Sequence, residues 1–324
     1  MSETRPWAFD ESLQPRDEEV GFDLAQALDA VLQLRAEVPE DAFTAGILGT
    51  ERVGSGVVIG PDGLVLTIGY LITEAENIWL TTNAGEAVAG HALAYDQASG
   101  FGLVQPLGEL HAPALARGTA AAVAAGDTVY AIGHGGRAHA LKARLIAKRE
   151  FAGYWEYLLE EALFTAPAHP QWGGAALVDA QGRLLGIGSL LLQEAVGDDA
   201  EQGNMFVPID LLEPILADLL AHGRAARASH PWLGMYTQQA EGQLIVGGLA
   251  PGGPAERAGV QAGDLVLGVA GERTASLADF LRRVWRLGGP GAEVPLMLAR
   301  QGDVLRISLR AADRNDFLKK PRLH

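Results

Sequence analysis

The stretch GSGVVIGPDGLVLTIG at residues 54–69 decides the fold class of this chain. Its two apolar runs flank a Pro-Asp-Gly sequence, and these three residue types favour tight turns. The stretch therefore predicts two strands joined by a turn. Short apolar runs of the same kind continue from residue 45 towards IDLLEPILADLLAHG (209–223), at a spacing typical of β-barrels. Residues 209–223 themselves predict a helix that ends at Gly223.

The chain before residue 45 has a different pattern. Residues 17–37, DEEVGFDLAQALDAVLQLRAE, place apolar side chains at helical spacing, and the acidic side chains gather near the start. This pattern predicts an amphipathic helix within an N-terminal extension of residues 1–44. The apolar face of that helix needs a docking surface, which is either the chain's own body or another subunit.

Composition excludes several classes of protein and site. The 324 residues carry a net charge of −15, and an acidic chain repels the phosphates of nucleic acids and of anionic membranes. The absence of cysteine excludes disulfides and Cys-based zinc sites. No sequence motif indicates a metal or a nucleotide, so we expect neither metal nor cofactor.

Hydropathy bears on location. No run reaches the ~18 consecutive apolar residues that a membrane-spanning helix needs, so we expect no membrane insertion. The first residues, MSETRPWAFDESLQPRDEEVGFD, lack the apolar core of a secretory signal. These observations predict a cytoplasmic protein.

Four segments, taken in order, resemble the HtrA/DegP family of trypsin-fold proteases, which carry a C-terminal PDZ domain. The four segments are GSGVVIGPDGLVLT (54–67), AYDQASGFGLVQ (94–105), GDTVYAIGHGG (126–136) and GNMFVPIDLL (203–212). The resemblance implies a mainly β fold: a trypsin-like double β-barrel followed by a PDZ domain, with the helical extension in front. The expected boundaries are 1–44 for the extension, 45–223 for the trypsin-like domain, 224–229 for a linker, 230–312 for the PDZ domain and 313–324 for a tail.

The three positions that match the family's catalytic triad hold other residues. Tyr70 stands in place of the general base, Gly100 in place of the aspartate and Gly173 in place of the serine nucleophile. Gly173 has no side chain for attack, and a tyrosine hydroxyl with a pKa near ~10 is a poor base at neutral pH. The resemblance therefore predicts a pseudoprotease, a chain that is not an enzyme. Gln171 and Trp172 complete the former oxyanion loop with Gly173.

Two alternatives to an inactive binding protein stay open. One is a serine-type peptidase with an unconventional site, in which His169 would act with Ser55, Ser99 or Ser189. No spacing rule supports that combination. The other alternative is a structural subunit that partners an active homologue.

The C-terminal part keeps a candidate peptide site. Residues 232–235, Trp-Leu-Gly-Met, resemble the family's carboxylate-binding loop, in which glycine lets backbone N–H groups approach a peptide terminus. PGGPAERAGVQAGDLVLGVAGERT (251–274) resembles the PDZ turn-helix-strand signature. The segment SLADFLRRVWRL (276–287) predicts a helix that walls the groove. The expected peptide-binding residues are Trp232, Leu233, Gly234, Met235, Phe280 and Val284.

These features together predict a protein-binding scaffold, adaptor or regulator. Because the expected pocket is apolar, we expect its partners to be proteins or peptides with apolar C-termini. A PDZ fold used only for packing within the chain is the alternative. The resemblance also implies a homo-oligomer, with a trimer slightly favoured, in which Trp7, Phe9 and Phe22 of the extension offer aromatic contacts.

Overall fold

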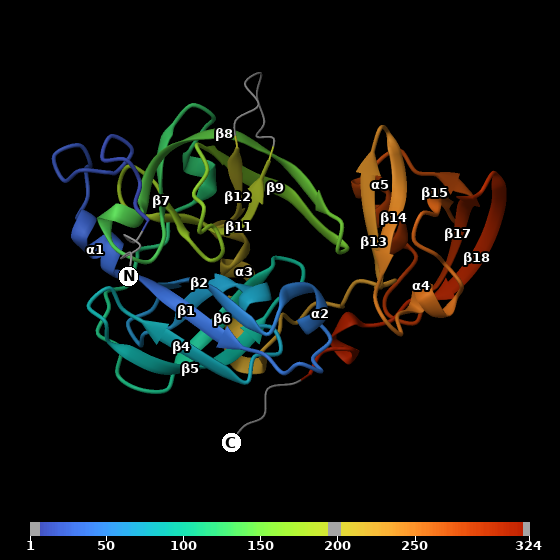
Figure 1. The fold of residues 1–324 in the computed structure, drawn as a ribbon, viewed down its shortest axis with the longest axis horizontal. Helices are drawn as coiled ribbons and strands as arrows, with labels where there is room; N and C mark the ends of the chain where they lie inside the picture. The colour runs from blue at the N-terminus through green and yellow to red at the C-terminus, as the bar shows by residue number, and fades with distance from the viewer. Residues whose placement is uncertain (1–6, 194–201, 320–324) are drawn as a thin grey trace, which may run out of the picture. The chain divides into compact units, whose positions relative to one another are not determined.

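The computed structural model describes residues 7–193 and 202–319, and the chain in these ranges is mainly β. Contacts between residues divide the chain into two units (Figure 1). The second unit comprises Glu150–Glu160 and Ala226–Leu318, and the first unit contains the remainder. Residues 1–6 of the expected extension and 320–324 of the expected tail lie outside the described residues.

The first unit contains a closed barrel with the strand order β1-β2-β3-β6-β5-β4. The turn expected within residues 54–69 joins β2 to β3, which pair antiparallel. The barrel strands are β1 (Val31–Glu37), β2 (Glu51–Val58), β3 (Val65–Ile68), β4 (Asn77–Thr81), β5 (Ala87–Tyr95) and β6 (Phe101–Pro106).

A second closed barrel follows in the same unit, with the order β10-β11-β12-β9-β8-β7. Its strands are β7 (Thr128–Ile132), β8 (Ala140–Gly153), β9 (Tyr157–Ala166), β10 (Ala176–Val178), β11 (Leu184–Leu192) and β12 (Gly203–Pro208). Apolar side chains that alternate along these strands fill the barrel, among them Val129, Ala131, Leu141, Leu163, Leu177 and Phe206. Two closed barrels confirm the expected double-barrel fold.

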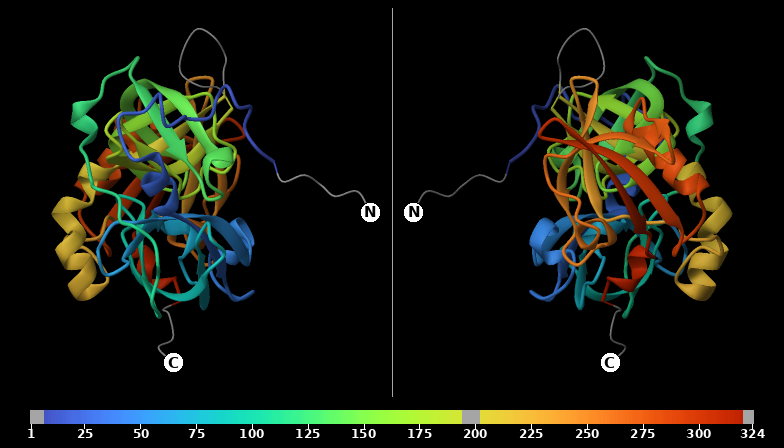
Figure 2. Two further views of the ribbon diagram at one scale, coloured as in Figure 1. Left: turned by 90° about the vertical axis from the view of Figure 1, so that its left-hand side faces the viewer. Right: turned by 90° about the vertical axis from the view of Figure 1, so that its right-hand side faces the viewer.

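Short helices connect and close the barrels. The helix expected at residues 209–223 forms η4 (Ile209–Leu211) and α3 (Glu213–His222), and it ends at Gly223, whose φ is 68°. Gly223 adopts the left-handed conformation that commonly ends helices. From the end of the second barrel, α3 packs back against β5 of the first (Figure 2). The other helical turns of the first unit are α1 (Leu24–Asp29), α2 (Ala45–Leu48), η1 (Gly69–Leu71), η2 (Ala120–Ala122) and η3 (Arg137–His139).

The helix expected over residues 17–37 is wrong for most of that span. Only α1 is helical, and residues 31–37 form β1, which pairs with β2 and β4. Leu32, Leu34 and Ala36 are fully buried while Arg35 is exposed, which is the alternation of a strand. Such a short apolar run fits the spacing of a helix as well as that of a strand, and pairing with β2 and β4 in the barrel selects the strand. The first barrel therefore begins within the expected extension.

The aromatic side chains of the extension pack on the chain's own first unit. The Trp7 ring lies 4.3 Å from that of His139, and the Phe9 ring lies 5.0 Å from that of His169, measured between centroids. Phe22 packs edge-to-face on Tyr130. Of the two docking surfaces that the sequence left open, the structure shows the one on the same chain.

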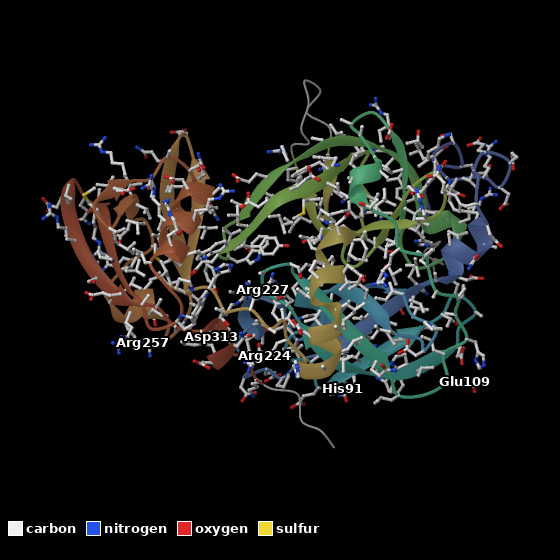
Figure 3. The ribbon with its side chains drawn as sticks, turned by 180° about the vertical axis from the view of Figure 1, so that it is seen from behind. His91, Glu109, Arg224, Arg227, Arg257 and Asp313 are labelled. Atoms are coloured by element: carbon white, nitrogen blue, oxygen red, sulfur yellow. The ribbon has the colours of Figure 1, made fainter. Side chains whose placement is uncertain are left out.

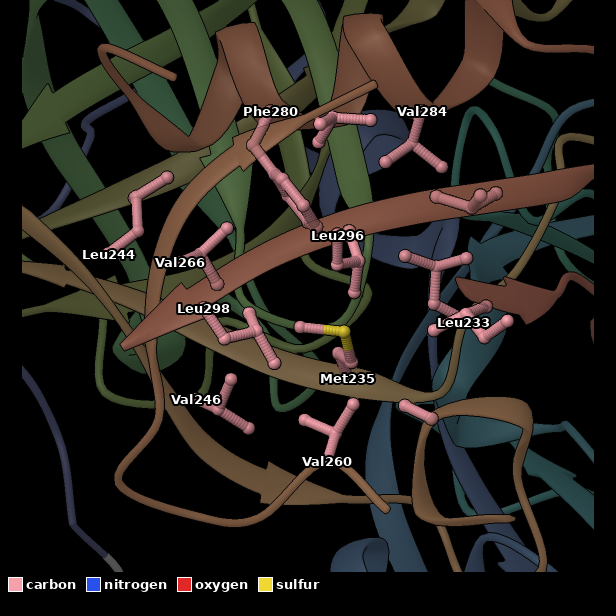
Figure 4. Close-up of a cluster of buried hydrophobic side chains, with 14 of the residues drawn as sticks. Leu233, Met235, Leu244, Val246, Val260, Val266, Phe280, Val284, Leu296 and Leu298 are labelled. Atoms are coloured by element: carbon pink, nitrogen blue, oxygen red, sulfur yellow. The ribbon is translucent and has the colours of Figure 1, made fainter. Parts of the chain in front are cut away.

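The second unit is a sheet with the order β13-β14-β15-β17-β18, and β16 pairs with β15. Its elements are β13 (Met235–Ala240), β14 (Gln243–Leu249), α4 (Pro254–Arg257), β15 (Leu265–Val269), β16 (Glu272–Arg273), α5 (Leu277–Arg286), β17 (Glu293–Arg300), β18 (Asp303–Arg310) and η5 (Arg314–Asp316). Figure 4 shows Phe280 and Val284 of α5 pointing from the helix into an apolar cluster that includes Leu233 and Met235.

Local sequence explains α5 and the ends of this unit. Ser276 caps the helix by accepting a hydrogen bond from the Asp279 N–H, and basic residues near the end suit the helix dipole. Arg257 and Asp313, labelled in Figure 3, contact the C-terminal part of this unit. The Arg257 guanidinium lies over the Phe317 ring, and Asp313 caps η5. Arg224 and Arg227 of the expected linker lie outside regular helix and strand.

Candidate functional site

The structure brings Tyr70 and Gly173 together. A Cβ placed on Gly173 would lie 3.0 Å from the Tyr70 hydroxyl oxygen, and that hydroxyl donates a hydrogen bond to the Ser189 carbonyl at 3.0 Å. Loss of water around the hydroxyl raises the pKa of Tyr70 well above its usual value. The hydroxyl therefore keeps its proton at neutral pH and faces a carbonyl oxygen rather than a nucleophile.

Gly100 lies beside the same place. Its φ is 81°, a left-handed conformation that favours glycine. Its carbonyl accepts a hydrogen bond from the Gly69 N–H at 2.7 Å, which brings it next to the start of η1 and Tyr70. The nearby Asp96 carboxylate accepts hydrogen bonds from the Ser99 N–H and hydroxyl. The three positions of the expected triad thus share one region of the first unit.

The loop that contains Gly173 is tightly fixed. A Cβ on Gly174 would lie 1.9 Å from the Ser55 carbonyl oxygen, and the Gly173 carbonyl accepts a hydrogen bond from the Ser55 N–H at 2.8 Å. The Gln171 N–H donates to His169 Nδ1 at 3.0 Å. In the former oxyanion loop, the Gln171 N–H is therefore already paired with the His169 ring.

His169 has no free nitrogen with which to act as a base. Its Nε2 lies 2.9 Å from the His139 carbonyl oxygen and donates to it, while Nδ1 accepts from Gln171. Burial lowers the pKa of His169 to about 4. Of the serines considered with it, Ser55 accepts a hydrogen bond from the His134 N–H and Ser99 donates to Asp96. The relocated combination does not form.

A second candidate site lies in the carboxylate-binding loop of the second unit. The Leu233, Gly234 and Met235 N–H groups lie 2.9, 2.7 and 3.0 Å from oxygens of one carboxylate, that of Glu156. Gly234 has a φ of 73°, and this left-handed turn aims three consecutive donors at one point. The loop of residues 232–235 thus donates three hydrogen bonds to a carboxylate of the same chain.

Glu156 was missed by the sequence reasoning. It lies in the turn between β8 and β9, with a φ of 62°, and belongs to the second unit with the rest of Glu150–Glu160. Burial raises the pKa of Glu156 to about 7, and the three N–H donors and Arg314 oppose that rise. The one available signal was an acidic residue between Trp155 and Tyr157 in a turn without glycine or asparagine.

The other expected peptide-binding side chains are placed in two ways. Leu233, Met235, Phe280 and Val284 are all buried in the core of the second unit. Trp232 points away from that core. Its ring packs on Phe317 at 4.8 Å between centroids, and its backbone N–H donates a hydrogen bond to the Ala312 carbonyl. Leu233 and Met235 of the loop thus share one apolar cluster with Phe280 and Val284 of α5, while Trp232 packs against Phe317.

In the described ranges, no helix is both long enough and apolar enough to cross a membrane. Within residues 7–193 and 202–319, no group of three or more His, Asp or Glu side chains is gathered that could hold a metal ion.

Known families match both parts of the chain. Residues 54–187 match the model of a trypsin-like peptidase domain, and residues 245–294 match that of a PDZ domain. The serine endoprotease DegS of Haemophilus influenzae is 22% identical over 263 residues, which cover 80% of this chain and 77% of that protein. A probable periplasmic serine endoprotease, DegP-like, of Halomonas elongata is 25% identical over 281 residues, covering 82% of this chain and 58% of that protein.

Solved structures share the fold. The HtrA-type protease AlgW with a tripeptide gives a TM-score of 0.52 at 20% identity, covering 92% of this chain and 97% of that chain. A serine endoprotease from Yersinia pestis gives a TM-score of 0.50 at 22% identity, covering 89% and 95%. The expected order of a trypsin-like domain and a PDZ domain is confirmed.

Two expectations are wrong in the light of these comparisons. Relatives named serine endoproteases point to a protease, which contradicts the expectation, based on Tyr70, Gly100 and Gly173, that the chain is not an enzyme. Substitutions at three positions show only which side chains cannot carry the familiar chemistry. The cytoplasmic expectation is contradicted because several relatives are named periplasmic. That expectation rested on the absence of a long apolar run and on the composition of the first residues.

Proposed function

We propose that this homologue of the HtrA-type serine endoproteases, in which a PDZ domain follows a trypsin-like peptidase domain, is an adaptor or regulator. It binds the C-terminal ends of other proteins through the PDZ domain. The observation that carries the proposal is the convergence of three backbone N–H groups, those of Leu233, Gly234 and Met235, on one carboxylate. Backbone capture of a terminal carboxylate at a sheet edge is how such domains recognise peptides.

The preferred partner has an apolar last residue. Leu233, Met235, Phe280 and Val284 belong to one apolar cluster of the second unit, so they bring no charge to a terminal side chain that packs against them. Burying one aliphatic side chain is worth ~1.5–3 kcal/mol, and each hydrogen bond to a carboxylate adds ~1.5–3 kcal/mol. After the cost of association, we expect affinity on the order of micromolar.

Location and assembly complete the proposal. We place the chain in the periplasm, following the names of its relatives. We also propose a homo-oligomer, with a trimer preferred. Trp7, 36% exposed, leaves part of its ring for contact with a second subunit. Light scattering that shows a monomer at micromolar concentration contradicts this assembly.

Peptide binding is tested with Gly234→Val. The substitution should weaken binding of apolar C-terminal peptides at least tenfold, because valine is strained at a φ of 73° and its Cβ would lie 3.2 Å from Ala250 Cβ. The matched control is Gly252→Val, which has a φ of 65° but nothing within 4 Å of its Cβ. Fluorescence anisotropy with labelled peptides measures the dissociation constants.

Amidated peptides supply the second control for this experiment. Removing the terminal charge should abolish binding to the intact chain. Equal affinity for the free and amidated peptides contradicts the proposed site, as does unchanged binding by Gly234→Val. Circular dichroism confirms that both glycine variants are folded.

The second candidate function is endopeptidase activity of the trypsin-like domain. The names of the relatives favour it. Such activity would use groups other than Tyr70, whose hydroxyl keeps its proton and faces the Ser189 carbonyl. Cleavage of unfolded casein at constant specific activity through successive purification steps supports it. Cleavage that separates from the protein during purification contradicts it.

A further inference from the structure

The carboxylate-binding loop is occupied by a side chain of the same chain. The three donors of residues 233–235 surround the Glu156 carboxylate, whose nearer oxygen lies 2.7 Å from the Gly234 nitrogen. Glu156 is buried, so its carboxylate is held inside the second unit rather than resting on the surface. Chemically, a glutamate side chain and a peptide C-terminus present the same group, a carboxylate on an sp³ carbon.

Backbone pairing accompanies this contact. β13 is an edge strand, and its Thr237 N–H donates to the Tyr154 carbonyl at 3.1 Å. Met235 and Thr237 lie two residues apart, so their N–H groups point to the same edge of the strand. One N–H meets the Glu156 carboxylate and the other meets a backbone carbonyl two residues earlier. An extended peptide that adds to a sheet edge makes the same two kinds of contact.

Side chains on both strands of the hairpin hold it in place. Ala152 and Leu158 pack against the apolar core of the second unit. Arg282 of α5 forms ion pairs with Glu150 on one strand and Glu160 on the other. The segment Glu150–Glu160, which we name the hairpin tip, thus contacts the edge of β13 and also α5, the two elements that border the expected groove.

We propose that the hairpin tip is a built-in competitor, in which the Glu156 carboxylate occupies the place of a ligand's C-terminal carboxylate. The inference rests on the proposed peptide-binding function and adds the regulation of that site. The same three N–H groups cannot serve both carboxylates, so an incoming terminus has to displace Glu156. The measured affinity of a ligand is then reduced by the fraction of molecules in which the loop is free.

Removal of the carboxylate tests the proposal. Glu156→Ala should tighten binding of an apolar C-terminal peptide at least tenfold, because the loop is no longer filled. Glu156→Gln keeps the size and an acceptor oxygen but cannot ionise, so the side chain should stay docked and should not tighten peptide binding. The matched control is Glu161→Ala, which removes an exposed glutamate of β9 that pairs with Lys148. The control should leave the dissociation constant unchanged.

Hydrogen exchange supplies a readout that needs no peptide. In the intact chain the amides of residues 233–235 and 237 should exchange slowly, and in Glu156→Ala they should exchange at least tenfold faster, while Glu161→Ala matches the intact chain. Slow exchange that is equal in the intact chain and in Glu156→Ala overturns the proposal. So does fast exchange in the intact chain.

The two readouts separate the competitor from the binding function. Faster exchange together with tighter peptide binding in Glu156→Ala supports both. Faster exchange with unchanged peptide affinity overturns the competition but leaves the peptide site. Faster exchange in a Glu156→Ala protein that binds no C-terminal peptide refutes the peptide-binding function itself, and with it the competition.

Discussion

At the scale of single residues, Glu156 links peptide binding to pH. Its pKa of about 7 lies above the ordinary value of 4.5, so the docked hairpin holds a proton more tightly than a free hairpin does. Docking is therefore strongest below pH 4.5, weakens as the pH rises towards 7 and is constant above that. The other titratable or charged groups that interact with Glu156 are Arg314 and Tyr236, and Tyr154 in turn interacts with Tyr236. The pKa of Tyr236 is raised by burial, so Tyr236 keeps its proton throughout.

The expected result is tighter peptide binding at higher pH. Between pH 5 and pH 7 the dissociation constant should fall by about tenfold or more, since each unit of pKa shift corresponds to about a factor of ten. A ligand's own α-carboxyl group titrates at ~3.3–3.7, below this window. Anisotropy titrations at several pH values measure the change, and Glu156→Gln should lose it. The same pH dependence in that variant would show that another group is responsible.

At the scale of elements, the hairpin tip is linked to α5 by the ion pairs of Arg282 with Glu150 and Glu160. Arg282→Ala should loosen the hairpin and tighten peptide binding by about two- to fivefold, less than Glu156→Ala does, because exposed ion pairs contribute only ~0–1 kcal/mol each. The matched control is Arg283→Ala, since Arg283 pairs with Asp279 and Glu272, outside the hairpin. Equal effects of the two variants would assign the change to α5 itself rather than to the hairpin.

The strand β1 supplies a stability test at the same scale. Leu34 is fully buried in the first barrel, so Leu34→Ala should lower the free energy of unfolding by about 2–5 kcal/mol. Arg35 is exposed on the same strand, and Arg35→Ala should change it by less than about 1 kcal/mol. Urea denaturation measures both. Similar small effects would instead fit a peripheral extension outside the barrel.

At the scale of the whole molecule, the sequence predicts the order of the domains and the placement of several site residues. Turn residues and apolar runs are local signals, so the strand pairs, α3 and α5 follow from them. Residues 31–37 could not be assigned this way, because their apolar spacing fits a helix as well as a strand. Glu156 could not be found either: it lies 78 residues from Gly234, and only the folded chain brings the two together.

The occupied loop has a consequence for selectivity. Every polypeptide ends in a carboxylate, so a permanently open loop would meet a large background of unrelated chain ends. Glu156 is tethered, and a tethered group acts at an effective concentration on the order of millimolar, whatever the dilution of the protein. A chain end that offers a carboxylate alone gains nothing over this resident group. Only a terminus whose preceding side chains add binding energy of their own displaces Glu156 from the loop.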